Sequence, residues 1–325
     1  KELEKEIPEV DFFSNKDFFL KQNRILTTAP IAYLKIAEGC SRQCSFCTIP
    51  LFKGPHKSRS LENVLAEAKA LEGKVHELIL VSQDTSFYGQ DLLGNSSLFY
   101  QLLERLADFN FPWIRILYFY PQNLTLEILK LIKSKPNICN YIDIPFQHLS
   151  NSVLKSMNRW GTFQDYQRIV DLIRENLDDS AIRSTFIIGY PTETQKDYEK
   201  LLEGLQKLNL DRAGFFKYSH EKEASSFKLN SLLDDHEIEK RFEQAVFISE
   251  EISEENLKKR IGKTYQAYIE EQDLDSGYYI ARSQLEAPEI DGVLLVEPKK
   301  DLKIGQWISF IPKDADFHNL VGSAL

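Results

Sequence analysis

The stretch Cys40-Ser-Arg-Gln-Cys44-Ser-Phe-Cys47 decides the fold of this sequence. It follows an apolar run, residues 31–37, which we predict to be a buried β-strand. Three thiolates on one loop can bind three irons of a cubane 4Fe-4S cluster and leave the fourth iron open. That open iron suits such a cluster to catalysis rather than to electron transfer alone.

S-adenosylmethionine (SAM) can chelate the open iron through its amino and carboxylate groups. One electron from the cluster can then cleave the sulfonium and release a deoxyadenosyl radical, which the protein orients and shields. The alternative is a structural zinc site, which needs four ligands, and His56 is the only nearby candidate for the fourth. The remaining cysteine, Cys139, is most simply a small buried hydrophobe.

The composition fits a globular protein of about two domains, because 42% of the 325 residues are hydrophobic and 27% are charged. No apolar run approaches the roughly 20 residues that cross a bilayer, and no secretory signal opens the sequence. We therefore expect a cytoplasmic protein without a membrane partner. The formal net charge of -9 argues against nucleic-acid binding through phosphate neutralisation.

Apolar runs alternate with helical patterns along most of the chain. Strands are predicted at residues 31–37, 77–82, 113–120, 141–146, 182–189 and 212–218. Helices are predicted at residues 61–71, 98–109, 126–133, 151–157, 163–176 and 195–208. This α/β alternation implies a parallel sheet, and six βα units are fewer than the eight of a closed barrel. We expect an open, partial (βα)6 barrel with its site at the carboxyl ends of the strands.

The pattern changes after the predicted barrel. A long charged helix is expected within residues 234–260, and residues 261–325 contain short β-runs separated by Gly, Pro and Asp, as in a small antiparallel β-barrel. The expected organisation is a linker over residues 1–28, the partial barrel over 29–233, a connecting helix over 234–260 and the small barrel over 261–325.

The cysteine motif, with Phe46 before its last cysteine, resembles the radical SAM superfamily, whose fold is a partial six-unit βα barrel. Several other stretches resemble the methylthiotransferases, and in particular the branch that modifies ribosomal protein S-twelve. These stretches are Ala32 to Cys40, Cys47-Thr-Ile-Pro50, Gly54, Ser58-Arg-Ser60, Ser82-Gln-Asp-Thr85, Tyr88-Gly89, Asp91-Leu92, Asp143 to His148, Ile182 to Pro191 with Glu193, and Ala287 to Gly292. The resemblance covers essentially the whole chain, and the small barrel resembles a TRAM domain.

The resemblance implies a reaction. It implies that the chain adds a methylthio group to the β-carbon of an aspartate in S-twelve, with a second SAM as methyl donor and a separate reducing electron donor. Full-length members begin with a domain that carries three more cysteines for a second 4Fe-4S cluster, and the start of this chain, residues 1–11, resembles the tail of that domain. We expect a truncated form that retains SAM cleavage and does not complete the sulfur transfer.

Polar groups at strand ends are the candidate SAM contacts. Gln83 and Asp84 end the second predicted strand and Gln147 ends the fourth, on the side where ligands bind in open βα folds. Ordinary turn chemistry is the alternative for Asp84. The neighbouring His148 is more simply a structural residue.

Arg183, Gly189 and Glu193 lie in and after the fifth predicted strand. We expect the Arg183 guanidinium to meet the SAM carboxylate, with a buried ion pair to an aspartate as the alternative. Gly189 permits close approach of the backbone to adenine, and Glu193 belongs to the same turn. Phe46 completes the expected SAM contacts. Radical abstraction needs no protein base, so no catalytic residue is nominated.

Two other functions remain open at this point: a methylthiotransferase that acts on tRNA, and a non-catalytic, metal-stabilised binding module. Residues 261–325 contain six Lys or Arg and eleven Asp or Glu. A module that grips RNA should be basic. The acidic balance therefore favours a basic protein substrate and argues against direct RNA binding.

Overall fold

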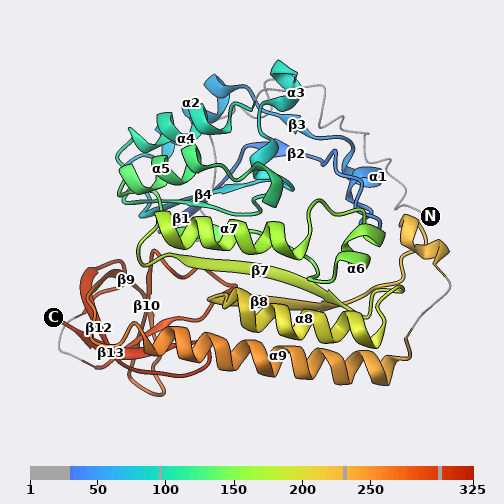
Figure 1. Ribbon diagram of the computed structural model, residues 1–325. Coiled ribbons are helices and arrows are strands. Elements are labelled where there is room, and N and C mark those ends of the chain that lie inside the picture. Colours follow the sequence, from blue (N-terminus) through green and yellow to red (C-terminus); the bar gives the residue numbers. More distant parts are fainter. Residues whose placement is uncertain (1–29, 95–96, 230–232, 299–301) are drawn as a thin grey trace, which may run out of the picture.

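A computed structural model describes residues 30–94, 97–229, 233–298 and 302–325. Its first part is built on six parallel strands (Figure 1). They are β1 (Ile31–Lys35), β4 (Glu77–Val81), β5 (Trp113–Ile116), β6 (Tyr141–Asp143), β7 (Ala181–Ile188) and β8 (Arg212–Lys217). Each strand lies within one residue of the predicted starting position.

The strands form an open arc in the order β1-β4-β5-β6-β7-β8. Two three-stranded sheets, β1-β4-β5 and β6-β7-β8, are joined by a parallel bridge between Ile114 and Ile138 and by the Phe119 amide, which donates to the Asp143 carbonyl oxygen at 2.9 Å. In the described part of the chain β1 and β8 do not pair with each other. The expectation of a partial (βα)6 barrel is confirmed.

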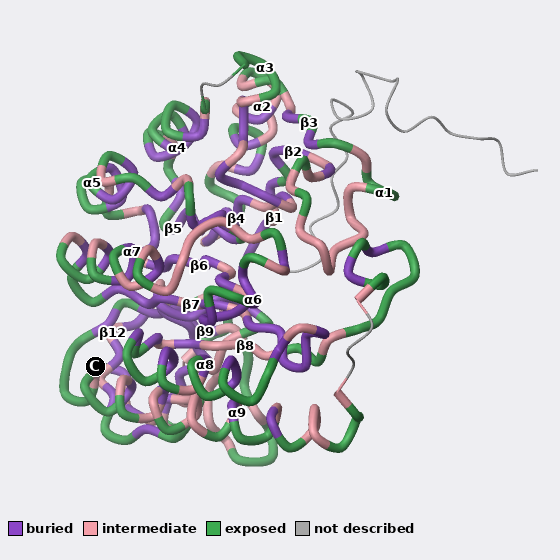
Figure 2. The backbone as a smooth tube through the Cα atoms, turned by 45° about the vertical axis from the view of Figure 1, so that its right-hand side comes forward, coloured by how far each residue is buried: buried purple, intermediate pink, exposed green. Residues whose placement is uncertain are grey.

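Amphipathic helices cover the outside of the arc, and their buried faces pack on the strands (Figure 2). The crossover helices are α2 (Leu61–Leu71), α4 (Phe99–Ala107), α5 (Leu126–Ser134), α6 (Asn151–Ser156), α7 (Phe163–Asn176) and α8 (Gln195–Leu208). Capping boxes begin α7, with Thr162 and Asp165, and α8, with Thr194 and Asp197. These local signals explain why the predicted helices agree with the structure.

Short elements around the cysteines were not predicted. Strands β2 (Ala37–Glu38) and β3 (Lys57–Ser58) form an antiparallel pair, and helix α1 (Ile49–Lys53) lies between them. A second short helix, α3 (Gln90–Leu93), follows β4. Elements of two to five residues carry too little periodicity to be recognised in a sequence.

The long helix α9 (Asp235–Lys258) packs against α8 and β8 and leads to the terminal barrel (Figure 1). That barrel is closed in the order β10-β11-β13-β12-β9. Its strands are β9 (Tyr265–Gln272), β10 (Tyr279–Ser283), β11 (Leu294–Val296), β12 (Trp307–Ala315) and β13 (Leu320–Ala324). Four of its pairings are antiparallel as expected, but β11 and β13 pair in parallel.

The two barrels share an interface that is apolar and ionic. One core cluster combines residues of the βα part, such as Ile79 and Trp113, with Tyr268 and Leu285 of the terminal part. Beside it the Glu77 carboxylate of β4 binds two arginines, Arg115 of β5 and Arg282 of β10. All three charged side chains are at most 1% exposed. Among the described residues, no helix has the length and apolar character to cross a membrane.

Candidate cluster and cofactor site

The cysteine loop begins at the β2–β3 pair, at the carboxyl end of β1. Gly39 has φ +76°, and a Cβ there would lie 2.3 Å from the carbonyl oxygen of Pro55. The next amide, that of Cys40, donates to the Gly54 carbonyl oxygen at 3.1 Å. A glycine is therefore required for the two ends of the loop to approach each other.

We expect Gly39→Ala to weaken cluster retention, because it adds a steric clash to the cost of a positive φ, on the order of 1–3 kcal/mol for the strained backbone alone. The matched control is Gly73→Ala, since Gly73 has φ +73° and nothing within 4 Å of an added Cβ. The measurement is iron bound per chain after anaerobic reconstitution. If the two variants bind equal amounts of iron per chain, Gly39 is not required for the ends of the cysteine loop to approach each other.

The far side of the loop is tied to the end of α6. The Ser45 amide donates to the Met157 carbonyl oxygen at 2.9 Å, and the Ser45 hydroxyl donates to the Ser156 carbonyl oxygen at 2.7 Å. Phe46 packs against the apolar cluster that contains Met157, Ile187 and Tyr190. The loop therefore lies across the carboxyl ends of the strands, and the predicted contact residue Phe46 lies there with it.

Asp84, which follows the end of β4, anchors the same loop. Its carboxylate is 3% exposed and accepts a hydrogen bond from Arg42 Nε at 2.8 Å and another from the Ser86 hydroxyl at 2.6 Å. Arg42 lies between Cys40 and Cys44, and its guanidinium stacks on the Tyr120 ring at 3.7 Å from the centroid. Asp84 therefore holds the cysteine loop, and its predicted contact with SAM remains a prediction.

Arg159 approaches the loop from the segment after α6. Its Nη1 lies 3.5 Å from Cys44 Sγ, and its Nη2 donates to the Pro145 carbonyl oxygen. Its guanidinium carbon is 4.4 Å from the centroid of the Tyr120 ring. Sequence reasoning missed both Arg42 and Arg159, because their partners are distant in the chain.

Gln83 follows β4, Gln147 follows β6, and both side chains are half-buried. Gln83 Oε1 is buried without a hydrogen-bond partner among the described residues. Gln147 has φ +76°, a conformation uncommon for a non-glycine residue, and its amide donates to the Thr185 carbonyl oxygen at 2.8 Å. Strained backbone of this kind concentrates at functional sites, and both residues remain predicted SAM contacts.

Arg183 has acidic partners within the chain. Its Nη1 donates to Asp143 Oδ1 at 3.1 Å, and its Nε lies 3.6 Å from Asp291 Oδ1 of the terminal barrel. Burial raises the pKa of Asp143 in spite of this guanidinium. The structure thus shows the ion pair that was the alternative interpretation of Arg183, and its contact with SAM remains a prediction.

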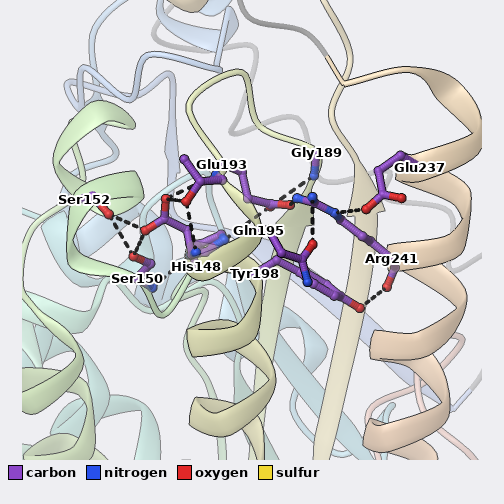
Figure 3. A network of polar contacts seen from close by, with 11 residues as sticks. His148, Ser150, Ser152, Gly189, Glu193, Gln195, Tyr198, Glu237 and Arg241 are labelled. Carbon is purple, nitrogen blue, oxygen red and sulfur yellow. Dashed lines mark hydrogen bonds and ion pairs between the residues drawn. The ribbon is translucent and has the colours of Figure 1, made fainter.

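Glu193 occupies the centre of a buried network (Figure 3). Its side chain is 0% exposed; Oε1 accepts from Arg241 Nη1 of α9 at 2.7 Å, and Oε2 accepts from the Gly189 amide at 3.1 Å and lies 3.3 Å from His148 Nε2. The other ring nitrogen of His148, Nδ1, accepts from the Ser150 amide at 2.9 Å. Glu193 therefore has partners within the chain on both carboxylate oxygens, and its contact with SAM remains a prediction.

The packing of α9 explains why residue 189 is a glycine. It has φ +79°, and an added Cβ would lie 2.7 Å from Cγ1 of Ile238. Glycine at this turn therefore permits the close approach of α9, and the expected approach of the backbone to adenine remains a prediction.

The donor set of the loop suits an iron-sulfur cluster. Cys40, Cys44 and Cys47 are free and half-buried, and burial raises the pKa of the Cys40 and Cys47 thiols. These thiols become ligands when metal replaces their protons. Among the described residues, no three His, Cys, Asp or Glu side chains form a compact site for a single metal ion. The alternative zinc ligand, His56, has its Nε2 3.2 Å from the Ser58 hydroxyl.

A cavity of about 600 Å³ lies elsewhere, at the amino ends of β7 and β8 beside the end of α9. Its lining includes Arg174, Asp211, Arg212 and Arg260 and none of the cysteines. The chemistry of the thiol groups, and not the size of this cavity, locates the candidate site.

The fold and the site together define a radical SAM enzyme core. A model of the Radical SAM superfamily matches residues 34–205, and a model of the TRAM domain matches residues 261–325. The coproporphyrinogen III oxidase HemN of Escherichia coli, described as a radical SAM enzyme, has the same fold with a TM-score of 0.54. It is 17% identical and covers 74% of this chain and 56% of its own.

Relatives with similar sequences show to which family of radical SAM enzymes the chain belongs. A protein of Clostridioides difficile named ribosomal protein uS12 methylthiotransferase RimO is 40% identical over 319 residues, which are 98% of this chain and 71% of that protein. Proteins of the same name from Alkaliphilus oremlandii and Flavobacterium johnsoniae are 38% and 37% identical, over 91% and 99% of this chain and 73% and 77% of theirs. The chain belongs to this methylthiotransferase family. The predicted family, fold and cofactors, a 4Fe-4S cluster and SAM, are confirmed.

Proposed function

We propose that this chain is a radical SAM methylthiotransferase that acts on the β-carbon of an aspartate in ribosomal protein uS12, in the cytoplasm. The observation that carries the proposal is the three-cysteine loop held across the carboxyl ends of an open six-stranded arc, in a chain of this family. When bound, the cluster and SAM supply the one-electron chemistry that removes hydrogen from the carbon to be modified.

The residues of the chain position these groups. Cys40, Cys44 and Cys47 would hold the cluster, and the Arg42–Asp84 pair fixes the loop that carries them. The free acceptor of Gln83 is suited to the amino group of SAM, and Phe46 supplies an apolar wall. We assign these functions to one domain, residues 29–233, which helix 234–260 connects to the terminal barrel, residues 261–325.

The charge of the terminal barrel supports a basic protein as substrate. Glu270 and Glu286 are used in ion pairs with arginines inside the protein. Other acids of the barrel are exposed, namely Glu271, Asp275, Glu289, Asp314 and Asp316. An acidic surface accelerates encounter with a basic protein and repels a polyanion.

In the test, either uS12 or a tRNA is added to this chain after its cluster has been reconstituted. SAM and dithionite are present in both reactions. We expect uS12, and not tRNA, to increase deoxyadenosine formation above the level with SAM alone. Mass spectrometry of uS12 would locate any modification at the aspartate. Stimulation by tRNA instead would replace the proposed substrate, and the absence of SAM cleavage by a loaded cluster would favour the non-catalytic binding module.

A further inference from the structure

We propose that Arg159 hydrogen-bonds to the cluster ligand Cys44 and supplies the positive charge that stabilises the reduced cluster. The inference rests on one part of the proposed function, the binding of a 4Fe-4S cluster by the three cysteines. Because Arg159 acts through Cys44, it is a positioning residue rather than a catalytic one.

The contacts of Arg159 fix its guanidinium beside the ligand sulfur. Nη1 is 3.5 Å from Cys44 Sγ, while Nη2 donates to the Pro145 carbonyl oxygen. The Tyr120 ring supports the guanidinium plane at 4.4 Å from its centroid. The Trp160 amide in turn donates to the Tyr120 hydroxyl at 3.3 Å. Two of these contacts, with Pro145 and with Tyr120, hold the planar guanidinium independently of the cysteine.

The charge of Arg159 distinguishes it from its neighbour Arg42. Arg42 stacks on the same Tyr120 ring, but the Asp84 carboxylate neutralises it at 2.8 Å. Within the described residues no carboxylate lies within ion-pair distance of Arg159, and its Nε is buried without a hydrogen-bond partner. A half-buried cation without a counter-ion is costly unless an anion is bound beside it. The Cys44 sulfur, 3.5 Å from Nη1, lies beside the guanidinium and would supply that anion as a cluster ligand.

This arrangement has a consequence for electron transfer to the cluster. Reduction adds one negative charge to a cluster that already carries thiolate ligands. Hydrogen bonds to those sulfurs and nearby positive charge both favour the reduced form and so raise the reduction potential. The family reaction begins with that reduction, so Arg159 acts on the step that precedes the chemistry of SAM.

The test compares the reduction potential of the reconstituted wild type with that of Arg159→Gln, Arg159→Lys and Arg168→Gln. Arg168 is the control, because it is a 76% exposed arginine of α7 whose guanidinium already pairs with Asp165. Potentiometric titration followed by electron paramagnetic resonance is done without SAM or substrate. We expect Arg159→Gln to lower the ratio of reduced to oxidised cluster about tenfold at a given potential, a shift of about 59 mV for one electron. Arg159→Lys should give a smaller shift in the same direction, and Arg168→Gln none.

An unchanged potential in a cluster-loaded Arg159→Gln protein overturns the proposal. If the glutamine variant binds no cluster, the lysine variant decides: a lowered potential supports the proposal, and an unchanged one overturns it. Failure of the wild type to bind a cluster would instead overturn the proposed function, so the two failures are distinguishable.

Discussion

Replacing Cys44 with alanine is expected to abolish deoxyadenosine formation from SAM and dithionite. The loop offers three thiolates for three irons, and the loss of one leaves the cluster without the ligand set that keeps a single iron open. The expected effect is loss of activity to background together with most of the bound iron. The measurement is deoxyadenosine by chromatography, with iron per chain determined on the same sample.

Cys139→Ala is the matched control for that experiment. Cys139 is also a free cysteine, but it is 2% exposed in the core shared by the two barrels, and burial raises its thiol pKa to about 12. We expect this variant to bind iron and cleave SAM like the wild type. Equal loss in both variants would mean that general damage, rather than ligand removal, explains the effect of Cys44→Ala.

Glu77→Gln is expected to destabilise the protein by about 3–5 kcal/mol, the cost of removing one partner from a buried ion pair. The variant would leave Arg115 and Arg282 buried together without the Glu77 charge. Arg282 would keep its second partner, Glu270, which is partly exposed. The free energy of unfolding should be measured by denaturant titration. Glu239→Gln is the control, because it removes a carboxylate from an exposed pair with Lys217.

The same carboxylate makes stability dependent on pH. Burial alone would raise the pKa of Glu77, but Arg115 and Arg282 outweigh it, so the pKa in the folded protein is below the ordinary value. The stabilisation is therefore present above the unfolded pKa and is lost as pH falls through the folded pKa. We expect Glu77→Gln to lose part of the acid sensitivity of the wild type. A variant as stable as the wild type at neutral pH would show that the arginines do not need this counter-ion.

The regular elements could be predicted from the sequence because their signals are local. The near-continuous apolar strands and capping pairs such as Thr194 with Asp197 specify each βα unit within a few residues of chain. The CxxxCxxC spacing likewise identifies cluster chemistry without a structure. Strand β13 is harder to predict, since it is short and its sequence includes Gly322 and Ser323.

The partners of the site residues could not be predicted, because they come from distant parts of the chain. Nothing near Glu193 indicates that Arg241, 48 residues later, will occupy its carboxylate. Asp84 and Arg42 are 42 residues apart, and Arg159 is 115 residues from Cys44. A polar residue at a strand end therefore indicates the correct region of the fold, while its partner comes from an element that is distant in the chain.

The core shared by the two barrels limits how this protein can be recombined. Tyr268 of β9 packs against Trp113 of β5 at 5.2 Å between ring centroids, while Arg282 of β10 binds Glu77 of β4. A chimera that takes its terminal barrel from another family member must carry residues that match both contacts. Otherwise the graft leaves a gap beside the Trp113 ring and leaves Arg115 as the one remaining ion-pair partner of Glu77 among the described residues. The terminal barrel can therefore be exchanged between relatives only together with the residues that make these two contacts.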